Sequence, residues 1–128
     1  MTVAYSNHPV QFHLVTTNRE RGLKLVDVEG ELGAAVATRW SGLFNSVVNE
    51  GATGIAVDLR GCRSVDPICL SVLLATSAVL KERGGGGVKL VTSPGSSLDR
   101  RLRALASDEL PAFDSASGAL GSLGDGHR

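Results

Sequence analysis

The side chains that can do chemistry lie closest together in residues 62–69, CRSVDPIC. Cys69 is predicted to lie in the first turn of a helix, where the positive end of the helix dipole lowers the pKa of a thiol and favours the reactive thiolate. A short connection can bring Cys62 and Cys69 within disulfide reach, which predicts a redox pair that controls a nearby surface. The alternative is that both thiols are small buried apolar residues, as free cysteines often are.

Asp66 and Pro67 mark the predicted start of that helix. Proline has no N–H to lose at the first helical position, and an aspartate before it accepts a hydrogen bond from an otherwise unpaired amide. Asp66 is therefore a helix cap, and it can also help to shape a docking site. Ser64, Ser71 and Thr76 carry nearby hydroxyls that can accept phosphate from a kinase, although each is more simply a turn or helix-surface residue.

The sequence lacks the usual motifs of enzymes, cofactor sites and metal sites. His8, His13 and His127 are dispersed, without the spacing of metal ligands. There is no Gly-x-Ser-x-Gly elbow, Walker loop or dinucleotide fingerprint. The glycines at 84–87 follow a predicted helix, whereas a phosphate-binding loop precedes one, so they predict a plain connection. We therefore expect no enzyme, no metal and no cofactor.

The composition predicts one soluble domain. A chain of 128 residues is one domain by length, and its 13 Lys+Arg balance its 13 Asp+Glu, so no strong field attracts nucleic acid or an anionic membrane. No apolar run reaches the ~20 residues that span a bilayer, and residues 1–10 lack a basic region followed by an apolar one. Two cysteines are too few for a secreted disulfide framework. These features predict a cytoplasmic protein that recognises its partner by shape.

Hydrophobic periodicity predicts the elements that position residues 62–69. Residues 1–9 are expected to be loosely ordered, and strands 11–16 and 23–28 to form an antiparallel pair. Residues 30–33 break the pattern, and a helix then runs from Ala34 to about Asn49 with Val36, Trp40, Leu43 and Val47 at helical spacing. A buried strand at 55–59 leads through a short loop, where we expect function to lie, to the helix from Pro67. A parallel strand at 88–91 follows through a right-handed crossover.

The last third of the chain is predicted to cover the sheet. Ser96 and Ser97 start a third helix, 108–113 can supply a short last strand, and 115–120 can form a final helical turn. Residues 121–128 are expected to be disordered. The third helix is predicted to bury Leu98, Leu102 and Leu105. The fold class is therefore α/β, with one domain at 10–120 and a mixed sheet of four to five strands covered by about four helices.

The helix from Pro67 carries two apolar faces when its residues are placed at about 100° intervals. The wider face is the predicted core and consists of Leu70, Leu73, Leu74, Ser77 and Leu80. The opposite stripe consists of Ile68, Val72, Ala75 and Val79. A helix on one face of a sheet needs only one apolar stripe. The second stripe therefore docks on another protein, or neighbouring loops or the third helix cover it.

The order and spacing of several pieces resemble STAS domains, the anti-sigma factor antagonist family also found in sulfate transporter tails and in lipid-transport and stressosome proteins. The resemblance covers residues from about 10 to 120 and implies the STAS fold and a regulatory binding role. The matching pieces are Gly30-Glu31-Leu32, Val57-Asp58-Leu59 with Val65-Asp66, Leu80-Lys81 with Gly84 to Gly87 and Val88 to Val91, and the Phe113 to Leu120 ending.

Antagonists of this family carry Asp-Ser-Ser-Gly at the start of the central helix, and the partner anti-sigma kinase phosphorylates the second serine. Here the stretch reads Asp66-Pro67-Ile68-Cys69, so Ile68 takes the phosphoserine position and cannot accept phosphate. Gly33 is a second departure, because many relatives carry an acidic residue there. The resemblance implies an anti-sigma factor with a GHKL-type ATPase fold as partner. The expected partner-binding residues are Leu32, Gly33, Ser64, Asp66, Pro67, Ile68, Cys69, Val72, Ala75 and Val79.

Two interpretations of function stay open. The first is a regulatory module that docks an anti-sigma factor through the start of the central helix, without phosphorylation at Ile68. The second is a scaffold or accessory subunit of a transport or stressosome-type assembly. A small-ligand sensor with an apolar cleft is a third interpretation. The sequence gives neither the partner's identity nor the oligomeric state, and neighbouring genes would discriminate between the first two.

Overall fold

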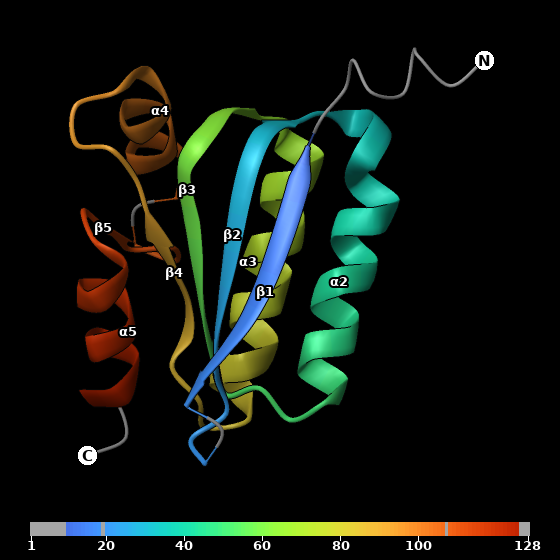
Figure 1. Ribbon diagram of the computed structural model, residues 1–128, viewed down its shortest axis with the longest axis vertical. Coiled ribbons are helices and arrows are strands. Elements are labelled where there is room, and N and C mark those ends of the chain that lie inside the picture. The colour runs from blue at the N-terminus through green and yellow to red at the C-terminus, as the bar shows by residue number, and fades with distance from the viewer. Residues whose placement is uncertain (1–9, 19, 107, 126–128) are drawn as a thin grey trace.

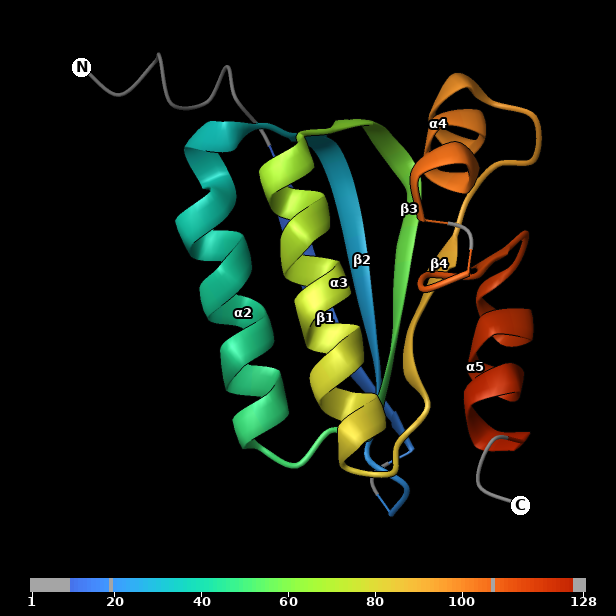
Figure 2. The ribbon, with the colours of Figure 1, turned by 180° about the vertical axis from the view of Figure 1, so that it is seen from behind.

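One five-stranded sheet forms the centre of the molecule, with α2 and α3 on one face and α5 on the other (Figure 1, Figure 2). This computed structural model describes residues 10–18, 20–106 and 108–125. The expectations for residues 1–9 and 126–128 lie outside the described residues. The elements are β1 (Gln11–Asn18), β2 (Leu23–Leu32), η1 (Ala34–Val36), α2 (Ala37–Asn49), β3 (Gly54–Val65), α3 (Pro67–Glu82), β4 (Gly87–Val91), α4 (Ser97–Ala106), β5 (Ala112–Phe113) and α5 (Ala116–Asp125). The predicted α/β class is confirmed.

The strands lie in the order β1-β2-β3-β4-β5. β1 pairs with β2 antiparallel, whereas β2, β3, β4 and β5 pair in parallel. Both the opening antiparallel pair and the parallel return after α3 are therefore confirmed. Residues 55–57 of β3 have no exposed surface, because helices cover both faces of the central strand.

Two strands extend further than predicted. β2 continues through residues 30–32, and β3 continues to Val65, where Leu32 and Val65 pair. The predicted break and the predicted loop before Asp66 are therefore wrong. Side-chain alternation fails at two register shifts in this pairing, while the backbone ladder goes on. Gly30 sits at one shift with a φ of 109°, a conformation that favours glycine.

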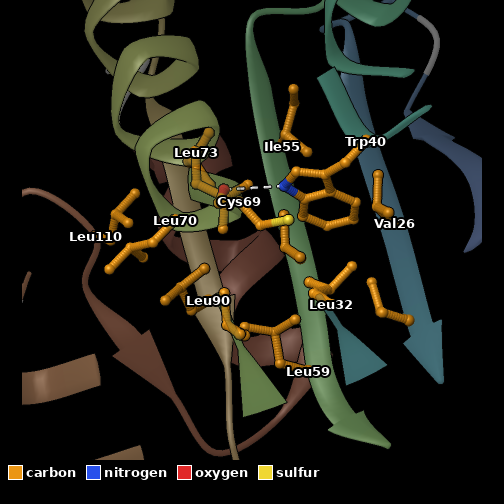
Figure 3. Packing of buried hydrophobic residues seen from close by; sticks show 14 of the residues in the cluster. Val26, Leu32, Trp40, Ile55, Leu59, Cys69, Leu70, Leu73, Leu90 and Leu110 are labelled. Carbon is orange, nitrogen blue, oxygen red and sulfur yellow. Dashed lines mark hydrogen bonds between the residues drawn. The ribbon is translucent and has the colours of Figure 1, made fainter. Parts of the chain in front are cut away.

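The main core lies between the sheet and the helices α2 and α3 (Figure 3). The rings of Phe12, Trp40 and Phe44 form its aromatic part, with centroids 5.1 Å apart for Phe12 and Trp40 and 4.7 Å apart for Trp40 and Phe44. α2 buries Trp40, Phe44 and Val47, and Leu43 is half-buried. The predicted amphipathic helix is thus confirmed, with Phe44 at its centre.

A smaller core lies under α5 and corrects the predicted tail. The helix extends to Asp125, and the side chain of Leu123 is completely buried against Leu23, Ala56, Val91 and Ala119. The expectation of disorder is therefore wrong for residues 121–125. A Cβ at Gly54 or at Gly86 would lie 2.9 Å from Leu123 Cδ2, so these two glycines provide the space that Leu123 fills.

Helix α4 buries a different set of residues from the predicted stripe. Leu98 and Leu102 are buried as expected, but Leu105 is 63% exposed and Ala106 takes its place in the core. Asp99 is also buried, and its carboxylate accepts hydrogen bonds from Thr92 Oγ1 at 2.6 Å and from Arg103 Nε at 2.9 Å. The hydrogen bond from Thr92 is the largest cause that lowers the pKa of Asp99. The network ties the end of β4 to α4.

Candidate functional site

The start of α3 is fixed by the cap that the sequence predicts. Asp66 has an extended backbone, and its Oδ1 accepts a hydrogen bond from the Ile68 amide at 2.9 Å. The Asp66 carbonyl accepts from the amides of Cys69 and Leu70. Pro67 occupies the first helical position, where no amide is needed. The two residues together hold Ile68 in the first turn.

Replacing Asp66 with alanine is expected to lower the free energy of unfolding by about 1 kcal/mol, because the Ile68 amide loses its acceptor. Asp66→Asn keeps a side-chain oxygen and is the matched control, with a loss of less than about 0.5 kcal/mol. Urea titrations followed by the fluorescence of Trp40 measure both values. Equal losses in the two variants would show that the charge of Asp66, and not its capping bond, stabilises the helix.

Ile68 lies on the surface beside a short segment of small residues. Its side chain is 51% exposed, and Pro67 and Ser71 are exposed in the same turn. Gly33, Ala34 and Ala35 are exposed as well. The Asp66 amide bonds to the Leu32 carbonyl at 2.7 Å, which places this segment next to the first turn. We call these residues the α3-start patch: Gly33, Ala34, Ala35, Pro67, Ile68 and Ser71.

The second apolar stripe of α3 is partly covered, and by α2. Val72 is half-buried and packs against the main core, whereas Ala75 is exposed and Val79 is 37% exposed. A cavity of about 240 Å³ lies between the two helices. Its lining residues are Asn45, Val48, Asn49, Ala75, Thr76, Val79 and Arg83. Only Val72 is therefore covered, and the exposed part of the stripe consists of Ile68, Ala75 and Val79.

Several predicted site residues lie in the core. Leu32 and Cys69 have no exposed surface, so neither side chain can contact a partner. The Cys69 carbonyl accepts a hydrogen bond from Trp40 Nε1 at 3.0 Å (Figure 3). Thr76 is also buried, and its hydroxyl donates to the Val72 carbonyl at 2.7 Å. Thr76 is thus excluded as an accessible phosphate acceptor.

The two remaining hydroxyls differ in accessibility. Ser64 is half-buried at the end of β3, whereas Ser71 is exposed. The Ser71 hydroxyl donates to the Pro67 carbonyl at 3.0 Å, one turn earlier in α3. Ser71 is therefore the more accessible of the two hydroxyls, and its hydrogen bond within the helix accounts for it as a helix-surface residue.

The thiols do not have the reactive character that the sequence suggests. Both cysteines are buried and free. Burial raises the pKa of Cys69, and the charge of Asp66 raises it further. Burial also raises the pKa of Cys62. The predicted lowering of the Cys69 pKa is therefore wrong, because burial and the nearby carboxylate both disfavour the thiolate. Oxidation to a bridge stays a prediction, and the burial supports the alternative of two small apolar residues.

A second cavity, which the sequence did not predict, lies between the end of β3 and the start of α4. Its volume is about 180 Å³, and Arg60, Arg63, Ser93, Ser96 and Ser97 are among its lining residues. The guanidinium of Arg60 is held by Asp58, with Nη2 2.7 Å from Oδ2. Burial opposes ionisation of Asp58, yet the hydrogen bonds from Arg60 leave its pKa lowered. No sequence motif predicts this cavity, because its lining residues lie far apart in the chain.

Neither a metal cluster nor a membrane helix occurs in the part of the chain that the structure describes. No group of three or more His, Cys, Asp or Glu side chains there can hold a metal ion. The helices in those ranges are also too short or too polar to cross a bilayer.

Solved structures of anti-sigma factor antagonists share this fold. An antagonist from Mycobacterium paratuberculosis matches with a TM-score of 0.73 and 20% identity, over 92% of this chain and 97% of that one. The antagonist SpoIIAA in its unphosphorylated form matches with a TM-score of 0.68 and 15% identity, over 91% and 99%. The Bacillus cell fate determinant SpoIIAA in its phosphorylated form matches with 0.63 and 14%, over 87% and 97%. No family model and no curated protein matches the sequence.

Proposed function

We propose that this chain, which shares the fold of anti-sigma factor antagonists, is a regulatory module that docks an anti-sigma factor through the α3-start patch. The exposure of Ile68 carries the proposal, because a large apolar side chain is 51% exposed in the first turn of α3. By the resemblance to the antagonist family, this is the position of the phosphoserine. One structural relative is described in a phosphorylated form, whereas an isoleucine has no hydroxyl to modify.

The chemistry of the patch favours recognition by apolar contact. Full burial of an isoleucine side chain is favourable by about 1.5–3 kcal/mol of free energy relative to leaving it exposed. Gly33, Ala34 and Ala35 are small, so a partner can approach the backbone closely on that side. A Cβ at Gly33 would meet nothing within 4 Å. The patch contains no charged side chain, so we expect docking to depend weakly on salt and to proceed without a phosphorylation switch at Ile68.

The partner that fits the resemblance is an anti-sigma factor with a GHKL-type ATPase fold. Asp66 and Pro67 would present Ile68 to it, and Val72, Ala75 and Val79 would extend the contact along α3 beyond the patch. Ser64, at the end of β3, would lie at the rim. The core residues Leu32 and Cys69 would act only by supporting the two backbone segments that carry the patch.

Replacing Ile68 with aspartate is expected to weaken docking by about 30-fold or more, because a charge would have to be buried against an apolar surface. Isothermal titration calorimetry against each anti-sigma factor of the source organism measures the dissociation constants. Leu105→Asp is the matched control, since Leu105 is 63% exposed on α4 and should bind like the unmodified chain. Trp40 fluorescence verifies that both variants fold.

Three outcomes would contradict the proposal. The first is that Ile68→Asp binds the anti-sigma factor as tightly as the unmodified chain. The second is that Leu105→Asp loses as much affinity as Ile68→Asp. The third outcome is that no anti-sigma factor binds at all, and the scaffold or accessory subunit is then the better interpretation. Intact-mass analysis after incubation with the partner and ATP tests the modification, and an added phosphate would direct attention to Ser71 or Ser64.

A further inference from the structure

The outer edge of β1 is open in the described structure. β1 pairs with β2 on one side, and no described strand pairs with its other side. Figure 1 shows β1 at the front of the molecule, with no other element drawn over it. The opposite edge strand, β5, has only two residues. A long open edge is a template for pairing with another strand.

β1 lacks the features that usually protect an edge strand. Its sequence, QFHLVTTN, has no Lys, Arg, Asp, Glu or Pro, and such residues are the common means of blocking edge pairing. The pairing with β2 is regular from Gln11 to Thr16, and its irregularity lies beyond Thr16, toward the turn. Most of the strand therefore presents a regular row of backbone groups.

Two exposed apolar side chains lie at the middle of this strand. Leu14 is 41% exposed and Val15 is 48% exposed. Because consecutive strand residues point to opposite faces, one lies on each face of the sheet edge. Only three other large apolar residues in the described ranges are exposed, namely Ile68, Val79 and Leu105. The edge thus offers apolar surface on both faces.

We infer that a second copy of this chain pairs with this edge, β1 against β1 in antiparallel order about a two-fold axis. In such a pair the residue on the axis meets its own counterpart. With Leu14 or Val15 on the axis, both side chains are covered by the other copy. No charged residue opposes a like charge, because β1 is uncharged and the charged Asp27 and Glu29 lie on β2, one strand away.

The two cavities described above favour a second copy over a peptide from another protein, because neither reaches β1. Edge pairing that selects a peptide uses pockets for alternate side chains. The cavity between α2 and α3 and the cavity between β3 and α4 contain no β1 residue in their linings. Without such pockets, the edge can recognise a partner only by backbone hydrogen bonds and by contacts of Leu14 and Val15. The same strand from a second copy provides both.

The pairing is expected to be weak. A stable interface buries about 1,200–2,000 Å², and a single strand edge with two apolar side chains provides less. We therefore expect a dissociation constant between about 10 µM and 1 mM. The chain is then a monomer when dilute and a dimer when concentrated, and the α3-start patch stays free in both states.

Sedimentation equilibrium across that concentration range tests the inference. The average mass of the unmodified chain should rise toward that of two copies. Leu14→Lys and Val15→Lys should each raise the dissociation constant about tenfold or more. Whichever of the two positions lies on the axis then places two lysines opposite each other, and the other loses its apolar contact and brings a charge into the interface. Leu105→Lys is the matched control and should dimerise normally. Thermal unfolding verifies that the lysine variants remain folded.

Hydrogen exchange locates the contact, and the slowing of amide exchange at high concentration should be confined to residues 11–17. A constant monomer mass would overturn the inference, and so would a dimer that both lysine variants retain. A dimer whose exchange slows in α3 would assign the contact to the α3-start patch instead. Ile68→Asp should dimerise normally, so failure of this inference and failure of the proposed function are distinguishable.

Discussion

Replacing Gly85 with alanine is expected to lower the free energy of unfolding by about 3 kcal/mol or more, because the new methyl group overlaps the backbone. A Cβ at this position would approach Thr53 O and would lie 3.1 Å from Leu80 O. Both oxygens accept hydrogen bonds here, Leu80 O from the Gly85 amide and Thr53 O from the Gly86 amide, each at 2.9 Å. Relieving the overlap means separating the end of α3 from the start of β3.

Gly42→Ala is the matched control for that prediction. Gly42 lies within α2, and a Cβ there would meet nothing within 4 Å. Alanine should therefore raise the free energy of unfolding by about 0.5–1 kcal/mol, since glycine destabilises a helix interior. Urea titrations of the two variants give the comparison. A Gly85→Ala protein within about 1 kcal/mol of the unmodified chain would show that the connection relaxes easily.

The sequence predicted the types and order of the elements because each local signal agreed with the fold. Alternation predicted the antiparallel pair, and the Asp66-Pro67 pair predicted the start of α3 to the residue. It missed the length of β2 and β3, because pairing between residues 29–32 and 61–65 is set by the backbone ladder and not by side-chain pattern. It also missed most of α5, because the burial of Leu123 depends on Gly54 and Gly86, which are distant in the chain.

The site was predicted in part. Helical spacing separated Ile68 from the leucine face of α3, and the exposure of Ile68 agrees with that separation. Spacing alone could not show that α2 would cover Val72 or that the chain after β2 would lie over Cys69. The dipole argument for Cys69 considered only its own helix. The structure adds burial and the nearby carboxylate of Asp66, and both act in the opposite direction.

The same contacts explain how the core supports the α3-start patch. Trp40 comes from α2, and its indole N–H bonds to the carbonyl of Cys69, the residue after Ile68. The side chain of Cys69 in turn approaches Gly33 O, with the sulfur 3.6 Å from the oxygen. One buried side chain therefore holds the first turn of α3, and Cys69 links that turn to the segment of small residues. The surface is assembled from two segments that the core holds together.

Replacing Trp40 with alanine is expected to lower the free energy of unfolding by about 3–5 kcal/mol, because it leaves a cavity beside Phe12 and Phe44. Trp40→Phe retains most of the packing and loses the hydrogen bond to Cys69, so we expect a smaller loss of about 1–2 kcal/mol. Guanidinium titrations followed by circular dichroism give both values, since the fluorescent side chain is removed. Leu43→Ala, at a half-buried position of the same helix, is the control for loss of apolar surface without the hydrogen bond.

Trp40→Phe also separates support of the patch from contact with a partner. The side chain of Trp40 is completely buried and cannot touch a docked protein. Losing its hydrogen bond to the Cys69 carbonyl should nevertheless loosen the turn that carries Ile68. We therefore expect faster amide exchange at residues 68–70 and weaker docking of the anti-sigma factor, while Leu43→Ala leaves both unchanged. If Trp40→Phe destabilises the chain but exchange at residues 68–70 and docking stay as they were, the first turn of α3 is held by its Asp66 cap alone.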